Sequence, residues 1–325
     1  MQLSIWYPAL RDATRHLTYW DYVALAGAET PSRASTADSA KDYDGFSAPF
    51  VGHGVPPATV RQWLGAAMLA TRDAEPSRAR HPLVIIAQGN GESAHDQAVL
   101  AEYLASYGYV VATCPSQTRI SGGLVTADDV GASAEEEAGD LAFVIAHARV
   151  RRDVNGQRIA IVGHSFGARG ALLLAMRRSG IGALVSLDGG IGTATGLASF
   201  RTAQSFAPEA MQAPVLHIYE TLDAFMTPDW TLLKAMHNAP VWIAEASAMH
   251  HHHFTSLGGL GAGYPAILAA TGGTEATTRS FVDVATTVRE FLDARVGSTP
   301  PVSSAPATGE PPTPGALRLR RLDDP

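Results

Sequence analysis

The chain is poor in cysteine, since Cys114 is the only one among its 325 residues. One thiol cannot form an internal disulfide, and it cannot supply the ligands of a cysteine-rich zinc site. Basic residues are also in the minority: 24 Lys and Arg stand against 31 Asp and Glu, for a net charge of −7. Because no basic surplus is available to neutralise phosphates, nucleic-acid binding is not expected.

Long apolar runs are missing as well. No uninterrupted apolar stretch approaches the roughly 18 residues that span a bilayer, so we expect no membrane span. Residues 1–8 hold neither a basic patch nor a long apolar core, which argues against a signal peptide. These residues are predicted to form a strand. One interpretation of such an N-terminus is that the chain is the mature form of a secreted protein whose leader was removed. The sequence does not assign a cellular compartment.

The overall composition is that of a globular protein. Hydrophobic residues make up 46% of the chain and charged residues 17%, which excludes wholesale disorder. The length suits one catalytic-size domain with tails, and we place that single domain at residues 1–296. Residues 297–315 are dense in Pro, Ser, Thr and Gly, and a short basic cluster follows. Residues 297–325 are therefore predicted to be a disordered tail.

Apolar strands alternate with helical patterns through the middle of the chain. Strands are predicted at residues 81–87, 109–113, 158–163, 183–187, 215–219 and 241–245, and helices at 96–107, 135–148, 167–178 and 277–296. Strands that are apolar throughout and alternate with helices indicate a mostly parallel sheet covered on both faces. Residues 189–212 are predicted to be a small lid-like insertion, and residues 30–55 an irregular polar stretch.

A candidate nucleophile lies between a predicted strand and a predicted helix. Ser165 is the centre of Gly163-His164-Ser165-Phe166-Gly167. A strand-to-helix turn this tight strains its central residue, and glycines two positions to either side avoid clashes. The Ser165 hydroxyl is then exposed at the end of the sheet, and the backbone N–H of Phe166 points into the same space.

The oxyanion that forms when a serine attacks a carbonyl needs a second N–H donor beside that of Phe166. In this type of site the second donor comes from the loop after an earlier strand. The Gly-rich residues 88–91 occupy that position. The backbone N–H of Asn90 is the first candidate, and that of Gly91 is the second.

The base is expected among four consecutive histidines, His250 to His253, which follow the last strand. Histidine suits a serine hydroxyl near neutral pH. Consecutive side chains diverge, so one histidine at most can serve, and His251 and His250 both stay open. The run could instead be exposed or bind a metal, although consecutive histidines make a poor tetrahedral cage.

Three carboxylates compete to orient that histidine. Asp188 directly follows one predicted strand, and Glu220 and Asp223 follow the next. The residues alone do not separate them.

Taken together, these motifs resemble the α/β-hydrolase superfamily. Within it the chain is similar to plasma-type platelet-activating-factor acetylhydrolases and dienelactone-hydrolase-like esterases. The similarity covers residues 82–91, 100–112, 163–167, 186–189 and 251–254. It implies an α/β-hydrolase fold and a serine esterase activity.

The resemblance also implies roles for individual residues. Asp188, 23 residues after Ser165, matches the position of the acid, and His251 matches the histidine with a phenylalanine three residues later. The oxyanion donors correspond to the backbone of Asn90 and Phe166. Two features depart from these families: Gln88 stands where a histidine is usual, and Ser165 stands where dienelactone hydrolases use cysteine. Dienelactone chemistry is therefore not expected.

The sequence thus predicts a hydrolase of short-chain or aryl carboxylic esters that works through an acyl-enzyme, with a small-molecule ester as partner. Neither a cofactor nor a metal is required. Amides, thioesters, lactones or polyesters are alternative substrates of the same machinery. A non-catalytic binding protein on the same scaffold and a metal-dependent protein that uses the histidine run are alternatives of other classes. The oligomeric state stays open.

Overall fold

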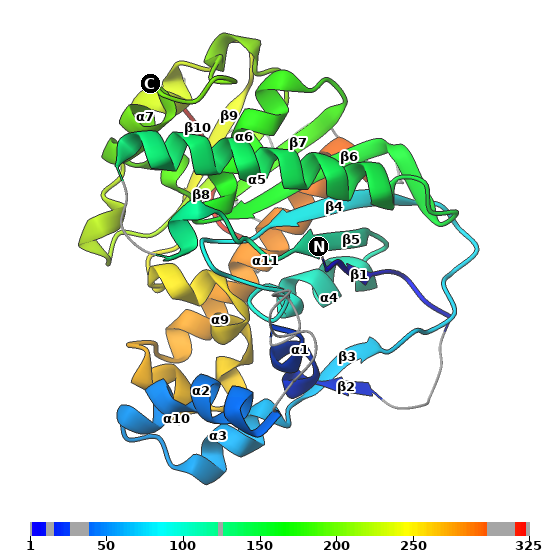
Figure 1. Cartoon of the computed structure of the whole chain (residues 1–325), viewed down its shortest axis with the longest axis vertical. Helices are drawn as coiled ribbons and strands as arrows, with labels where there is room; N and C mark the ends of the chain where they lie inside the picture. The colour runs from blue at the N-terminus through cyan, green and yellow to red at the C-terminus, as the bar shows by residue number, and fades with distance from the viewer. Residues whose placement is uncertain (1, 11–15, 27–38, 123–125, 298–315, 323–325) are drawn as a thin grey trace.

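The computed structural model describes residues 2–10, 16–26, 39–122, 126–297 and 316–322. Its centre is a sheet that has eight strands within these residues (Figure 1). In spatial order they are β1 (Ser4–Trp6), β5 (Val110–Cys114), β4 (His81–Ala87), β6 (Val154–His164), β7 (Ile181–Leu187), β8 (Val215–Tyr219), β9 (Val241–Glu245) and β10 (Arg320–Arg321). The six inner strands run parallel, while β1 and β10 pair antiparallel at the edges. This is the mostly parallel sheet that the sequence predicts.

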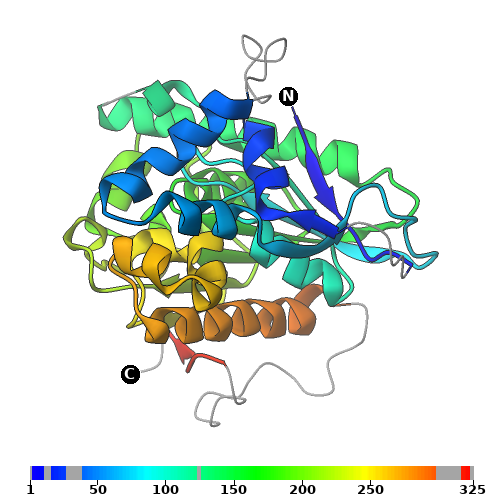
Figure 2. The same ribbon diagram turned by 90° about the horizontal axis from the view of Figure 1, so that it is seen from below.

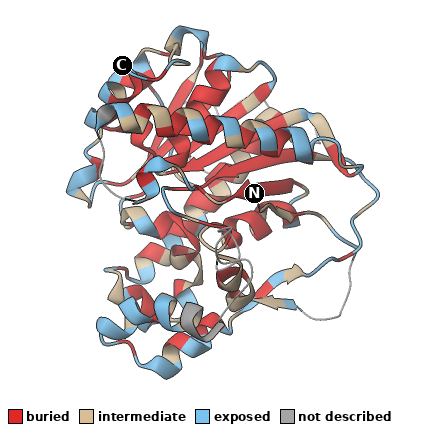
Figure 3. Ribbon diagram, viewed as in Figure 1, coloured by how far each residue is buried: buried red, intermediate tan, exposed pale blue. Residues whose placement is uncertain are grey.

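Helices cover both faces of the sheet. One face packs against α4 (Ala98–Ser106) and α11 (Glu275–Val296), and the other against α5 (Ala127–Ala148) and α6 (Gly167–Arg177). Figure 2 shows α11 (orange) along one side of the sheet and the green helices on the other. The inner strands are largely buried (Figure 3), which explains why their sequences are apolar at most positions.

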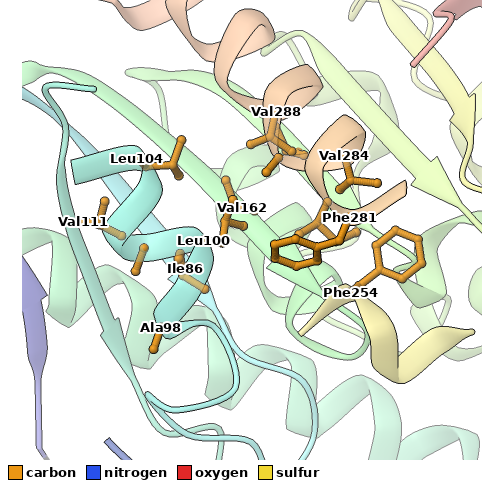
Figure 4. Packing of buried hydrophobic residues seen from close by; sticks show 14 of the residues in the cluster. Ile86, Ala98, Leu100, Leu104, Val111, Val162, Phe254, Phe281, Val284 and Val288 are labelled. Atoms are coloured by element: carbon orange, nitrogen blue, oxygen red, sulfur yellow. The ribbon is translucent and has the colours of Figure 1, made fainter. Parts of the chain in front are cut away.

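The core on the α4 and α11 face also anchors the segment that carries the histidine run. Figure 4 shows Val162 of β6 and Leu100 of α4 packed beside Phe281 of α11. Phe254, at 1% exposure, belongs to the same cluster and lies three residues after His251. Fully burying a side chain of this size contributes about 1.5–3 kcal/mol. The burial of Phe254 therefore holds in place the backbone segment that carries His251.

The N-terminal third folds into more helix than the sequence predicts. The helices are α1 (Tyr19–Ala26), α2 (Ser39–Gly52) and α3 (Pro57–Leu64). They lie in the chain between β2 (His16–Thr18) and β3 (Ala67–Thr71), which pair as a separate two-stranded antiparallel sheet. The prediction of an irregular stretch at 30–55 is wrong over residues 39–52, which form α2, while residues 53–55 are irregular and residues 30–38 lie outside the described residues. Gly45 and Pro49 weaken the helical signal of α2. Tertiary packing compensates, because Phe46 and Phe50 both contact the buried ring of Trp63.

The predicted insertion at 189–212 forms short helices. They are η2 (Gly190–Gly192), α7 (Ala194–Phe200) and η3 (Pro208–Ala210). Phe200 is buried in the core of the α5 and α6 face. A Cβ at Gly131 of α5 would lie 3.1 Å from the carbonyl oxygen of Ser199, so this glycine lets α7 approach α5 closely.

The remaining short elements lie in the loops between the strands and the longer helices. They are η1 (Arg119–Gly122), η4 (Ala224–Met226), α8 (Thr231–Lys234), η5 (His251–Phe254), α9 (Ser256–Leu260), η6 (Gly261–Gly263) and α10 (Pro265–Ala270). Among the described residues, no helix is both long and apolar enough to cross a membrane.

The prediction of a disordered tail over residues 297–325 needs correction at residues 316–322. Arg320 and Arg321 form β10, which pairs with Ile243 and Trp242 of β9. Leu322 is buried at 6% exposure, and Arg321 lies over the ring of Trp242. The open edge of β9 provides backbone partners that a composition argument does not consider. Residues 298–315 and 323–325 lie outside the described residues.

Candidate active site

The turn from β6 into α6 carries Ser165 in a left-handed conformation, with φ of 51°. Such a φ is strained for a residue other than glycine, as the sequence predicts for the centre of this turn. A Cβ at Gly163 would lie 2.6 Å from Cα of Ala168, and a Cβ at Gly167 would lie 2.3 Å from the carbonyl oxygen of Ala87. Both distances are too short for a real Cβ, which accounts for the two glycines.

The side chains of Ser165, His251 and Asp188 form one continuous chain of contacts. Nε2 of His251 lies 2.8 Å from Oγ of Ser165, and Nδ1 lies 2.5 Å from Oδ2 of Asp188. Asp188 also has a positive φ, 43°, and its Oδ1 accepts the backbone N–H of Glu220 at 3.1 Å. The Asp188 side chain is 2% exposed. A buried carboxylate on Nδ1 leaves Nε2 unprotonated, in position to accept the serine proton.

The competing carboxylates have other partners. Oδ1 of Asp223 lies 2.9 Å from Nδ1 of His250, and its Oδ2 accepts the backbone N–H of His251 at 2.8 Å. Partial burial opposes ionisation of Asp223, but these hydrogen bonds outweigh it and lower its pKa. The Glu220 carboxylate accepts the backbone N–H groups of Leu222 and Asp223. In the part of the chain that the structure describes, neither carboxylate forms a hydrogen bond with the ring of His251.

The four histidine side chains do not all diverge, contrary to the expectation for consecutive residues. His251 turns to Ser165, while the rings of His250, His252 and His253 pack against one another, with centroids 4.3 to 5.9 Å apart. Besides the two already described, Nε2 of His252 contacts the carbonyl oxygen of Thr271 at 2.9 Å. His253 is buried, and its Nδ1 accepts the backbone N–H of His250 at 3.0 Å. Burial, together with the neighbouring histidines, lowers the pKa of His253 to about 3. No group of three or more potential metal ligands converges among the described residues.

Neither of the two oxyanion donors that the resemblance implies, the backbone N–H groups of Asn90 and Phe166, makes a hydrogen bond within the described residues. Asn90 is exposed at the end of the loop after β4, and its side-chain Oδ1 accepts a hydrogen bond from Ser121 at 2.8 Å. The N–H of Gly91, the second candidate from the sequence, is donated to the carbonyl oxygen of Ser116 at 3.0 Å. Of the two loop candidates, Asn90 therefore retains a free donor.

Sequence reasoning missed two neighbours of His251. Phe225, 67% exposed, meets the ring of His251 edge-on at 5.3 Å between centroids. On another side, the ring of His164 stacks on that of His251 at 4.9 Å, and His164 also binds Glu92. Glu92 is 72 residues from His164 in the chain. No local pattern connects residues so far apart, and the sequence therefore holds no signal for this contact.

Comparison with known proteins assigns the chain to a family. The model of the dienelactone hydrolase family matches residues 69–251, which include Ser165, Asp188 and His251. The chain belongs to the dienelactone hydrolase family. It is therefore a hydrolase, as the sequence predicts. No curated protein matches the chain.

The fold of this family member is also that of a solved structure. A ferulic acid esterase from Streptomyces cinnamoneus superposes with a TM-score of 0.67 at 18% sequence identity. The match covers 99% of this chain and 88% of the other. It confirms the predicted α/β-hydrolase fold.

Proposed function

We propose that this member of the dienelactone hydrolase family is a serine esterase that cleaves small carboxylic esters, short-chain or aryl, through an acyl-enzyme. The observation that carries the proposal is the unbroken contact from Ser165 through His251 to Asp188, at 2.8 Å and 2.5 Å. The 2.8 Å between Nε2 of His251 and Oγ of Ser165 lies within the range that proton transfer between a serine and its base requires.

The proposed reaction begins with attack of Ser165 Oγ on the ester carbonyl carbon. Nε2 of His251 takes the hydroxyl proton, and Asp188 stabilises the imidazolium that results. The N–H groups of Asn90 and Phe166 donate to the oxyanion, and a single donor of this kind contributes about 3 kcal/mol to the transition state. His251 then protonates the leaving alcohol, and water releases the acyl group by the same steps.

The surroundings of His251 support a small or aromatic substrate. Phe225 offers an exposed aromatic ring beside the proposed base, and aromatic rings favour stacked or edge-on contacts with each other. The similar solved structure is a ferulic acid esterase. An acyl-chain-length series with matched aryl esters tests this part of the proposal. A preference for long, emulsified triglycerides would contradict it.

The decisive experiment is labelling with a fluorophosphonate, followed by mass-spectrometric mapping of the modified residue. Hydrolysis of p-nitrophenyl acetate is measured in parallel. We expect the label on Ser165, loss of turnover in proportion to labelling, and neither label nor turnover in Ser165→Ala. Ser106→Ala, which removes an exposed serine at the end of α4, is the matched control and should behave as wild type. Folded wild-type protein without label or turnover would favour a binding protein on this scaffold.

A further inference from the structure

Against the ring of the proposed base packs a histidine that forms a further carboxylate–histidine contact, between Glu92 and His164. Nδ1 of His164 lies 2.8 Å from Oε1 of Glu92, and the His164 side chain is 1% exposed. Nε2 of His164 lies 3.3 Å from the carbonyl oxygen of His251. Both ring nitrogens thus face acceptors, and a histidine that donates from both nitrogens carries a positive charge.

The charge state of this contact follows from its surroundings. Burial alone would lower the pKa of His164, but the charge of Glu92 and its hydrogen bond outweigh burial and raise it. Burial would likewise raise the pKa of Glu92, yet His164 and the backbone N–H of Gly89 lower it. The two residues therefore form an ion pair whose charges compensate each other in a largely buried setting.

The pair joins three segments of the proposed active site. Oε2 of Glu92 accepts the N–H of Gly89, the residue before Asn90, at 2.6 Å. His164 directly precedes Ser165 in the turn after β6, and its Nε2 binds the backbone of His251. The proposed oxyanion loop (residues 88–91), the turn that carries Ser165 and the segment that carries His251 thus meet at one ion pair. Among the described residues, this pair makes no hydrogen bond to the Ser165 hydroxyl.

We propose that Glu92 and His164 are positioning residues: their buried ion pair holds the oxyanion loop and the His251 ring at the distance from Ser165 that acyl transfer requires. The inference rests on the proposed esterase function and extends it to two residues outside the triad. A displacement of about 1 Å at such a site can lower the reaction rate about 100-fold. An ion pair that holds three segments of the site in place therefore affects the rate.

The test uses the full chain and counts active sites. Glu92→Gln removes the charge at nearly constant volume, and His164→Gln leaves a single amide where two ring nitrogens had been. We expect each to lower kcat for p-nitrophenyl acetate, per site that fluorophosphonate labels at completion, by about 10- to 100-fold. KM should stay within about twofold, because the pair does not face the substrate. Glu209→Gln, the same change at an exposed glutamate of η3, is the matched control and should not alter kcat.

Two further variants separate positioning from simple support of the fold. Glu92→Asp keeps the charge with a shorter reach, and its kcat should lie between those of wild type and Glu92→Gln. The double variant Glu92→Gln/His164→Gln should be no slower than the slower single variant, because residues that act as one unit do not lose activity additively. A structural role alone would reduce the labelled fraction and the melting temperature and leave kcat per labelled site unchanged.

The outcomes are distinct. Folded Glu92→Gln with kcat per labelled site within about twofold of Glu209→Gln would overturn the inference, and so would additive losses in the double variant. If Glu92→Gln does not fold, the double variant, which buries no unpaired charge, takes its place with the same criteria. If no variant folds, the Glu92–His164 pair is needed for folding itself, and the proposed positioning role is overturned. Wild type that neither labels nor turns over would instead contradict the proposed function.

Discussion

Two aspartate–histidine pairs lie side by side beyond the C-terminal ends of β7, β8 and β9. Asp188 contacts His251 and Asp223 contacts His250, at 2.5 Å and 2.9 Å. The Asp188 side chain is 2% exposed and that of Asp223 is 20% exposed. Within the described residues, only the first pair continues to a serine hydroxyl, that of Ser165. The comparison teaches that residue types do not distinguish a proposed catalytic pair from its neighbour, whereas burial and the third partner do.

The largest expected difference between the pairs comes from removing the histidines. His251→Ala should lower kcat on the order of 10⁵- to 10⁶-fold, because Ser165 loses its base. His250→Ala should stay within about tenfold of wild type, since Asp223 still holds the backbone of His251. Steady-state hydrolysis of p-nitrophenyl acetate measures both. Equal losses in the two variants would erase the distinction between the pairs.

Substitution of the two aspartates should also lower kcat more in the first pair than in the second, but the losses should be smaller than those of the histidine variants. Asp188→Asn should lower kcat about 10⁴-fold, since an amide can favour the wrong tautomer of His251. Asp223→Asn keeps an oxygen for the N–H of His251, so a loss below about tenfold is expected. A pre-steady-state burst assay isolates the acylation step that both changes would affect. A larger loss in Asp223→Asn would transfer the role of the acid to Asp223.

Phe225 packs against the ring of His251 and should matter for substrate choice. Phe225→Ala is expected to raise KM for a phenyl ester about three- to tenfold and to affect an acetyl ester of an aliphatic alcohol less, because an aromatic contact contributes about 1 kcal/mol. Phe143→Ala, an exposed phenylalanine of α5, is the control. An equal effect on both ester classes would remove Phe225 from the substrate site.

The smallest effect concerns stability as a function of pH. Hydrogen bonds lower the pKa of the folded Asp223 below its usual value near 3.8. The stabilisation is therefore present above about pH 4 and is lost as the pH falls through the lower, folded-state pKa. Asp223→Asn should reduce stability by less than about 1 kcal/mol at pH 7, as this pair is partly exposed, and the deficit should shrink as the pH falls below about 4. Thermal unfolding of both proteins from pH 3 to pH 7 measures this; a deficit that grows toward pH 3 would reverse the sign.

Structural features that depend on residues close together in the sequence could be predicted. The spacing of Gly163, Ser165 and Gly167 predicts the turn with its positive φ, because backbone clashes are local. The apolar strands and the helices of the middle of the chain were predictable for the same reason. The helix α2 was not, since Gly45 and Pro49 oppose it locally and aromatic packing on Trp63 favours it. The pairing of residues 320–321 with β9 depends on a free sheet edge, which composition does not reveal.

The sequence by itself determined the parallel sheet, the conformation of Ser165 and the short set of candidate acids and bases around it. These follow from hydrophobic periodicity and from steric limits on neighbouring residues. Only the tertiary structure brought His251 to Ser165 across 86 residues, separated Asp188 from Asp223, and packed His164 of the Glu92–His164 pair against the ring of the base. Contacts over such separations depend on how whole strands and loops pack, and a single sequence carries no local record of that.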